Sequence, residues 1–588
     1  MMPDATPRRS DLPDWFPPWA VQLADLYFSG TTAAFVLYGN TQDLFRGRTN
    51  TSPSYGVLAE FLAEQLFGRW SLVLHYDLGR GLRAFAGRDE QRLKEMVPLA
   101  NRKIGDVSAL AKDPAAAFAA LDRLVRNNIM AAEADRISVA VIMDQASYVF
   151  PAADPGRLSL QSSSELVTML NWATSPHVKR LNMAFVIVDE KLADLNDRLT
   201  GNPHVAAIEV PLPNEAERAA FIEVSTAGAP LAGFSDFNAA ELAKLTAGIS
   251  LTDLNVLVQS AQENQKRLDA QVFRSLKKRL IERQCRGLLE FIEPRWTLDT
   301  VVGHEAAKAR LRDDAALLKR GALDSLAMGY LLCGPVGTGK SFLAQCVSGE
   351  IGIPCVILKN FRSKYVGETE GNLEHVLSVL RAMGPVVVVV DEADAALGSR
   401  EQEGDSGTSS RVFGMIAAQM GDTRYRGRII WMLLTARPDL LPIDLKRQGR
   451  AEVHIPLFYP TDEQEIRQMF VILAKKLGSR LAPEDVPPIP QRGDLSGADI
   501  EGMVGRAWRA SLLAGADHIT REALAEVVAQ FMPSTQGLER ELQETAAMLE
   551  CTDRQFLPPA IVERIDKEGG RGKLQARLTA LKQIVREL

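Results

Sequence analysis

Short apolar runs separated by longer helical patterns occur in both halves of the chain and predict α/β domains. Apolar runs that are rich in β-branched residues and bounded by Gly or Pro are typical of buried parallel strands. In the second half the clearest runs are Tyr330 to Cys333 and Pro385 to Val390, the latter with five consecutive valines. The first half contains Phe35 to Tyr38, Ser71 to Tyr76, Ile137 to Met143, Met183 to Val188 and Val205 to Val210.

A glycine-rich loop follows the run at Tyr330 to Cys333, and a helical pattern through Glu350 follows the loop. Strand, loop and helix in this order are the context of a phosphate-binding P-loop, because glycines let backbone N–H groups turn toward phosphates at the positive end of a helix. Lys340 would reach the β- and γ-phosphates and Ser341 would hold Mg²⁺. The loop therefore predicts an ATPase, and its sequence is Gly334-Pro335-Val336-Gly337-Thr338-Gly339-Lys340-Ser341.

Two carboxylates follow the valine run. Parallel strands deliver the residues at their carboxyl ends to one edge of the sheet, so Asp391 and Glu392 are expected beside the P-loop. There Asp391 would bind Mg²⁺ through water, and Glu392 would polarise the water that attacks ATP.

These motifs and four further segments resemble the AAA ATPases, particularly the branch of valosin-containing protein, FtsH and the proteasomal ATPases. The resemblance covers residues 296 to about 530. The segments are Trp296 to Gly303 on the adenine side, Ser363 to Glu368 as a first pore loop, Arg437 to Arg450 as the second region of homology, and Ser496 to Ile500 at the start of a helical lid.

The resemblance implies a five-stranded parallel sheet with helices on both faces, a small helical lid, and a ring that is usually a hexamer. Arg447 and Arg450 would enter the neighbouring subunit's ATP site, and Tyr365 with Val366 would grip a polypeptide in the pore. The nucleotide would be bound by Val302, Gly303, Pro335, Val336, Gly337, Thr338, Gly339, Lys340, Ser341, Phe342 and Asp391, with Mg²⁺ on Ser341 and Asp391.

One position departs from the family. Directly before Arg437, where a polar sensor is usual, the chain has Ala436 preceded by Thr435. Either Thr435 takes the catalytic role of positioning water, or hydrolysis is slow.

The first half repeats the pattern of the second half without its chemistry. The segment from Ile249 to Ala261 aligns without gaps on the segment from Leu495 to Ala507, and both resemble AAA lid helices. The first strand, however, continues into Gly39-Asn40-Thr41-Gln42-Asp43, which lacks a lysine, and Gln145 stands where the second half has Glu392. We therefore expect a degenerate AAA-like domain that binds no nucleotide.

These patterns predict five parts of the chain. They are an N-terminal apolar segment at 1–30, the degenerate domain at 31–290, the large ATPase subdomain at 291–460, its helical lid at 461–535 and a helical C-terminal extension at 536–588. The extension has an amphipathic stripe at Leu574, Leu578, Leu581 and Val585, which is typical of a packed terminal helix.

Composition and charge narrow the class of function. The 588 residues suffice for two large domains plus extensions, and a net charge of -6 favours neither nucleic acid nor an anionic membrane as a partner. The five cysteines form no Cys-x-x-Cys pair, and the sequence shows neither a signal peptide nor an apolar stretch of the roughly 20 residues that cross a membrane. We expect a cytoplasmic protein without membrane insertion.

Two functions remain open from the sequence. The first is a hexameric ATPase that remodels or unfolds a protein substrate or complex through its central pore, which Tyr365 favours. The second is an assembly or switch ATPase whose ring is a platform with slow hydrolysis and no threading, which Ala436 and the first domain favour.

Overall fold

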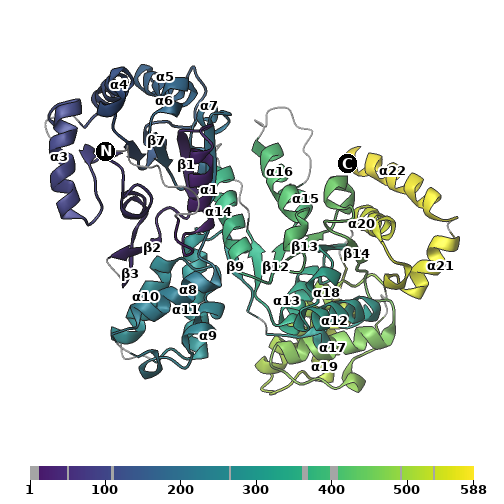
Figure 1. Cartoon of the computed structure of the whole chain (residues 1–588). Helices are drawn as coiled ribbons and strands as arrows, with labels where there is room; N and C mark the ends of the chain where they lie inside the picture. The colour runs from purple at the N-terminus through teal and green to yellow at the C-terminus, as the bar shows by residue number, and fades with distance from the viewer. Residues whose placement is uncertain are drawn as a thin grey trace. The chain divides into compact units, whose positions relative to one another are not determined.

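A computed structural model describes the chain at residues 12–49, 52–107, 112–228, 230–263, 267–293, 295–359, 368–397, 408–489, 493–533, 537–567 and 569–587. The chain divides into two compact units (Figure 1). The first comprises Met1–Cys285 with Arg362–Met383, and the second comprises Arg286–Phe361 with Gly384–Leu588.

The first unit is built on a mixed sheet in the order β5-β4-β6-β7-β1-β8. Five of these strands are parallel, and β5 pairs with β4 in the antiparallel direction. The five parallel strands confirm the five apolar runs, and a separate hairpin joins β2 to β3. The strands are β1 (Ala34–Gly39), β2 (Leu44–Thr49), β3 (Ser52–Val57), β4 (Leu72–Asp77), β5 (Gly81–Ala84), β6 (Val139–Met143), β7 (Met183–Val188) and β8 (Val205–Val210).

Helices pack around this sheet and form a core rich in aromatic residues. The ring of Trp172 stacks on Phe118 at 5.5 Å and on Phe185 at 5.0 Å. The N-terminal apolar segment belongs to the same core, in which Phe16 and Trp19 are buried. The helices are α1 (Pro18–Phe28), α2 (Leu58–Phe61), α3 (Glu90–Ile104), α4 (Pro114–Met130), α5 (Leu160–Thr174), α6 (Pro176–Arg180) and α7 (Asp197–Thr200).

A helical subdomain follows β8. It consists of α8 (Glu215–Ser225), α9 (Ala239–Leu245), α10 (Leu251–Glu263) and α11 (Ala270–Gln284). Helix α14 (Glu368–Ala382) also belongs to the first unit, although the chain on either side of it belongs to the second. Arg381 on α14 forms an ion pair with Glu209 at 2.6 Å, and Lys191 donates to Asn372 at 2.8 Å.

The second unit repeats the same sheet. Its order is β14-β10-β13-β12-β11-β9, with β9 antiparallel to β11 and the other strands parallel. In each unit the parallel strands, numbered along the chain, lie in the order 2-3-4-1-5, with an antiparallel strand beside the second. The strands are β9 (Leu289–Phe291), β10 (Gly329–Cys333), β11 (Cys355–Leu358), β12 (Val386–Val390), β13 (Ile429–Thr435) and β14 (Val453–Pro456).

This topology confirms the expected fold class and adds one strand to each sheet. The edge strands β5 and β9 extend the predicted five-stranded sheets, and neither Gly81–Ala84 nor Leu289–Phe291 is long enough to give a periodic pattern. All five valines of β12 are buried, because both neighbouring strands and the covering helices enclose them.

Helices complete the second unit in three groups. Around the sheet lie α12 (Glu305–Lys319), α13 (Lys340–Ile351), α15 (Ala393–Leu397) and α16 (Thr408–Met420). The lid consists of α17 (Glu463–Lys476), α18 (Gly497–Leu513) and α19 (Arg521–Gln530). The C-terminal arm, residues 537–587, consists of α20 (Gly537–Glu550), α21 (Pro559–Lys567) and α22 (Arg571–Glu587), the last two drawn in yellow in Figure 1.

In the described part of the chain no helix combines the length and the apolar character needed to cross a membrane.

Candidate nucleotide-binding site

The P-loop connects β10 to α13, and two of its glycines are required by what lies against them. Gly334 has a φ of +145°, and a Cβ there would collide with the Leu457 carbonyl oxygen. Gly337 has a φ of +83°, and a Cβ would lie 2.7 Å from the Cβ of Ser496 in the lid. The chain can therefore pass between β14 and the lid only with glycine at these two positions.

Backbone N–H groups around this loop form a candidate anion cradle. Among the described residues no hydrogen-bond acceptor is found for the N–H groups of Gly337, Gly339, Lys340, Ser341, Gly497 and Ala498. The first four belong to the P-loop and the start of α13, and the last two begin lid helix α18. Because helix N-termini favour anions, the two ends together can bind a phosphate chain.

Lys340 is held inside the loop. Its Nζ donates to the carbonyl oxygens of Gly334 and Pro335, both at 2.8 Å. Burial lowers the pKa of Lys340 to about 8. A phosphate can replace the two carbonyl oxygens as the partner of this ammonium group, and its negative charge would favour the protonated form.

The candidate magnesium ligands are already in contact. Ser341 Oγ donates to Asp391 Oδ2 at 2.8 Å, although the two residues are separated by 50 positions in the sequence. The N–H of Glu392 donates to Asp391 Oδ1 at 2.9 Å. The Ser341 hydroxyl at the end of the P-loop and the Asp391 carboxylate just after β12 are oxygen ligands of the kind that Mg²⁺ prefers. These two residues therefore fit the ion.

Glu392 lies at a strained position. Its φ of +47° is in the left-handed region, which is costly for a residue with a side chain. The side chain is exposed at the edge of the cavity beside Asp391. This conformation turns the chain sharply at the end of β12 and leaves the carboxylate accessible to water.

The sensor position also lies in the cavity, but its hydroxyl is engaged. Thr435 is buried at the end of β13, and its Oγ1 donates to Asp394 Oδ1 at 2.6 Å. The same oxygen accepts the N–H of Arg437 at 2.9 Å. Because its proton goes to Asp394, Thr435 can only accept a hydrogen bond from a water molecule in this conformation.

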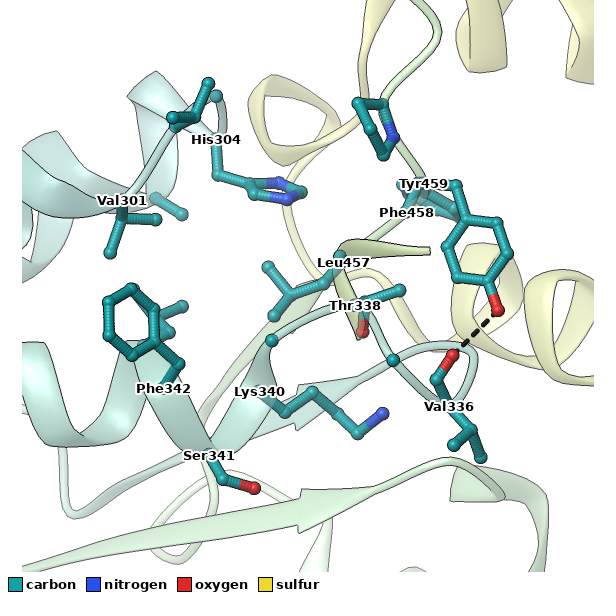
Figure 2. Close-up of a pocket in the computed structure, with 18 of the residues that line it drawn as sticks. Val301, His304, Val336, Thr338, Lys340, Ser341, Phe342, Leu457, Phe458 and Tyr459 are labelled. Atoms are coloured by element: carbon teal, nitrogen blue, oxygen red, sulfur yellow. Dashed lines mark hydrogen bonds between the residues drawn. The ribbon is translucent and has the colours of Figure 1, made fainter. Parts of the chain in front are cut away.

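The adenine side of the cavity is mostly apolar. Figure 2 shows Val301, His304 and Phe342 on the side of the P-loop away from Tyr459. Val302 and Gly303 line the same cavity, whose volume of about 870 Å³ lies within the usual range for ligand pockets. Burial lowers the pKa of His304 to about 4, so its imidazole is neutral at neutral pH.

The two arginines of the second region of homology lie outside this cavity's lining. Arg447 has 60% of its side chain exposed and lies 3.7 Å from Asp444. Arg450 is only 14% exposed and donates to the Asp444 carbonyl oxygen at 2.8 Å. Arg447 is therefore the more available of the two to a second copy of the chain. Tyr365 and Val366 lie outside the described residues.

The corresponding place in the first unit is filled by a carboxylate. Asp43 is 2% exposed and accepts the N–H groups of Leu251 and Thr252, at 2.9 and 2.7 Å. These two N–H groups begin α10, as those of Gly497 and Ala498 begin α18. A side chain of the protein thus occupies the helix N-terminus that is open in the second unit.

The backbone at the end of β6 also repeats the second site. Gln145 has a φ of +52°, and its N–H donates to Asp144 Oδ1 at 2.9 Å, as Glu392 donates to Asp391. Ser250 caps α10 by accepting the N–H of Asp253 at 3.0 Å, and Ser496 caps α18 in the same way through Asp499. The first unit therefore keeps the backbone of the site without its lysine and glutamate.

Sequence reasoning missed three residues in or beside the cavity: Asp394, Tyr459 and Gln543. Asp394 lies three positions after Asp391, so its place on the first turn after the strand could have identified it. Tyr459 OH donates to the Val336 carbonyl oxygen at 2.7 Å, and Gln543 Oε1 accepts the Val336 N–H at 3.1 Å. Nothing in the local sequence of Tyr459 or Gln543 indicates these contacts.

The sequence matches three family models that agree with this architecture. Residues 7–211 match the AAA+ chaperone N-terminal Rossmann-like domain, and residues 216–286 match the AAA+ chaperone second helical domain. Residues 330–459 match the ATPase family associated with various cellular activities (AAA).

Known relatives match as well. The chain is 29% identical over 333 residues to the cell division cycle protein 48 homolog of Archaeoglobus fulgidus, which covers 51% of this chain and 44% of that protein. It is 30% identical over 274 residues to the ATP-dependent zinc metalloprotease FtsH 3 of Sphaerobacter thermophilus, covering 44% and 55%. It is 28% identical over 397 residues to the human peroxisomal ATPase PEX6, covering 58% and 39%. The chain thus spans about half the length of these relatives or less.

Proposed function

Because this chain is a member of the AAA ATPase family, we propose that it binds ATP with Mg²⁺ in the cavity between its P-loop and lid, and that it hydrolyses the nucleotide. Lys340 neutralises the β- and γ-phosphates, Ser341 and Asp391 hold Mg²⁺, and Glu392 polarises the attacking water. Val302, Gly303 and Phe342 hold the base. Mg²⁺ held by Ser341 and Asp391 would offset negative charge on the phosphates.

One observation carries this proposal above the others. The N–H groups of the P-loop and of α18 for which the described residues offer no acceptor line the same cavity as Ser341 and Asp391. A cradle of this kind favours an anion, because the positive N-terminal ends of α13 and α18 line the same cavity. A nucleotide phosphate chain supplies the acceptors.

We further propose a ring, with six subunits as the expected number, in which Arg447 completes the site of the neighbouring subunit. The exposure of the Arg447 side chain supports this role, since only an exposed arginine can extend into the ATP site of a neighbouring subunit. Arg450 would act through Arg447 or the loop that carries both. In this proposal the ring remodels a protein substrate, and Tyr365 with Val366 contacts the polypeptide in the pore.

A second candidate function is an assembly or switch ATPase whose ring is a platform. The hydrogen bond from Thr435 to Asp394 supports it, because Ala436 supplies no polar group and Thr435 has no proton left to orient water. Slow hydrolysis would then keep the ATP-bound state for long periods. The rate of turnover of the unaltered protein separates the two functions.

The ATP site is tested by two substitutions, of which only one should weaken nucleotide binding. Lys340→Ala should weaken Mg·ATP binding by at least about tenfold, because a charge-assisted contact to phosphate is lost. Glu392→Gln should bind Mg·ATP as the parent does and hydrolyse it about 10²- to 10⁴-fold more slowly, because it contacts water and not phosphate. Calorimetry gives the affinities, and phosphate release gives the rates.

Lys319→Ala is the matched control. Lys319 is exposed on α12, outside the cavity lining, and donates to the Glu350 carbonyl oxygen at 3.0 Å, so its removal should change neither quantity. Equal affinities for Mg·ATP in Lys340→Ala and the parent would contradict the assignment of the site. A parent that turns over only once in many minutes would favour the switch over the remodelling function.

A further inference from the structure

The C-terminal arm packs on the second unit's ATPase domain at several places. Lys446, in the second region of homology, forms an ion pair with Glu550 at the end of α20, at 2.5 Å. Lys582 on α22 lies 3.0 Å from Asp439 in the same region. Phe556, which follows α20, is buried in the main hydrophobic core of the unit. The arm is therefore continuous with the body of the ATPase domain.

The arm also lines the candidate ATP cavity. Its residues there come from α20 and from the segment that connects α20 to α21: Glu539, Gln543, Gln555, Phe556, Leu557, Pro558 and Pro559. None of them falls within the residues that match the AAA family model, which ends at 459.

One side chain of the arm contacts the P-loop itself. Gln543 is 6% exposed, and its Oε1 accepts the N–H of Val336 at 3.1 Å. The carbonyl oxygen of Val336 accepts the Tyr459 hydroxyl at 2.7 Å (Figure 2). Side chains from outside the loop thus bond both the N–H and the carbonyl oxygen of Val336. Gln543 lies 207 positions from Val336 in the sequence.

The arm also holds Tyr459. The guanidinium of Arg540 on α20 lies 4.5 Å from the centre of the Tyr459 ring. Arg540 is in turn fixed by Glu544 at 2.9 Å and by Asp494 at 3.0 Å. One helix of the arm therefore supports both hydrogen bonds to Val336, one directly through Gln543 and one through the ring of Tyr459.

We propose that the C-terminal arm is a working part of the nucleotide site, in which Gln543 is a positioning residue that holds the P-loop in its phosphate-binding conformation. The proposal rests on the ATP-binding function proposed above. Val336 immediately precedes the cradle, whose first unpaired N–H belongs to Gly337. Fixing Val336 on both sides fixes the direction of the N–H groups that follow, so less freedom is lost when the phosphates bind.

The direction of the effect follows from this geometry. The Val336 N–H is bonded to Gln543, so it is not one of the N–H groups that would bond phosphate. Without Gln543 the peptide can rotate toward solvent, since Val336 is 62% exposed, and the cradle loses its preformed shape. Nucleotide affinity should fall, whereas the chemical step should be little changed, because Gln543 is bonded to Val336 and not to the proposed magnesium ligands or to Glu392.

The test substitutes Gln543→Met, which keeps the length of the side chain and removes the acceptor. Mg·ADP affinity, measured by calorimetry, should fall about three- to tenfold, the size expected for one hydrogen bond. The KM for ATP should rise by a similar factor while kcat stays within about twofold of the parent. A merely structural role would lower the melting temperature without separating KM from kcat in this way.

Glu541→Gln is the matched control on the same helix. It removes the ion pair of Glu541 with Arg577, at 2.8 Å between α20 and α22, and leaves Val336 untouched. Its Mg·ADP affinity should equal that of the parent. Equal weakening in Glu541→Gln and Gln543→Met would overturn the proposal in favour of a general loosening of the arm.

A measurement on the unaltered protein covers the case in which Gln543→Met fails to fold. Coupling between two sites is reciprocal, so saturating Mg·ADP should slow hydrogen exchange in α20 relative to α3 of the first unit. Unchanged exchange in α20 on saturation, or parental affinity in a folded Gln543→Met, would overturn the role of the arm. A parent that binds no Mg·ADP would instead overturn the proposed function, and this inference with it.

Discussion

At the scale of single residues, two left-handed backbone positions mark the ends of corresponding strands. Gln145 follows β6 with a φ of +52°, and Glu392 follows β12 with a φ of +47°. The first unit retains this strained backbone at Gln145, although the amide side chain of Gln145 cannot act as a base. The backbone at this position is therefore a property of the fold, and the proposed catalytic role belongs to the glutamate side chain alone.

His304 provides a residue-scale prediction about pH. Its folded pKa, about 4, lies below the ordinary 6.5 because of burial first and then the charge of Lys308, while Glu305 acts in the opposite direction. A group with a depressed pKa contributes stability above its unfolded pKa and loses it as the pH falls through the folded value. The second unit should lose about 1–2 kcal/mol of unfolding free energy through His304 between about pH 6.5 and pH 5.

His304→Asn tests this, since asparagine tolerates the left-handed φ of +54° at this position. Unfolding in urea is compared at about pH 7.5 and about pH 5. The loss of unfolding free energy at the lower pH should be about 1–2 kcal/mol smaller in His304→Asn than in the parent. His518→Asn is the control, because His518 is exposed beside Asp517. The same pH dependence in the parent and in His304→Asn would show that the imidazole is not the group responsible.

At the scale of elements, the start of each lid helix shows why one unit is open to a ligand and the other is closed. Both α10 and α18 are capped by a serine that accepts the N–H three residues on. In α10 the two preceding N–H groups are bonded to Asp43, and in α18 they have no acceptor among the described residues. An aspartate in the first unit thus takes the place that phosphate would take in the second.

Asp43→Ala is the prediction at this scale. Its carboxylate accepts two N–H groups and the Thr252 hydroxyl, at 2.9 Å, so its loss should cost about 2–4 kcal/mol in the stability of α10 and its neighbours. Hydrogen exchange across α10, relative to the strands of the same unit, measures this. Asp236→Asn, which breaks an exposed ion pair with Arg267, should cost less than about 1 kcal/mol. Unchanged protection of α10 in Asp43→Ala would refute the cap.

At the scale of the whole molecule, the candidate site of one chain lacks the arginines that the proposed function takes from a neighbouring subunit. The cavity lining contains the P-loop, Asp391, Glu392 and the lid, but neither Arg447 nor Arg450. Arginine supplied in trans to a phosphoryl-transfer site is worth on the order of 10³ to 10⁵ in rate. An isolated chain should therefore bind nucleotide and hydrolyse it poorly.

Mixing two inactive variants tests action in trans. Arg447→Ala should keep an intact P-loop but offer no arginine, and Lys340→Ala should offer the arginine but bind nucleotide weakly. In randomly mixed rings, about a quarter of the sites should have both parts, so activity should return to roughly that fraction of the parent. Activity that stays at the level of the separate variants, in rings shown to have exchanged subunits, would argue against the role of Arg447.

The sequence by itself determined the fold class and predicted most of the residues that the structure brings together in the candidate site. Parallel strands rich in valine and a loop with fixed glycine spacing are local patterns, so they identified Lys340, Ser341, Asp391 and Glu392 without a structure. The repeated lid segments likewise predicted two similar units, and the common strand order confirms this.

Only the tertiary structure decided what surrounds those residues. Gln543 reaches Val336 across 207 positions, and Asp43 reaches Thr252 across 209, and neither pair has a local pattern that could have indicated it. The edge strands β5 and β9 were missed because three or four residues carry no period. Local patterns record which face of an element is buried, whereas the partner that buries it is chosen by the packing of the whole chain.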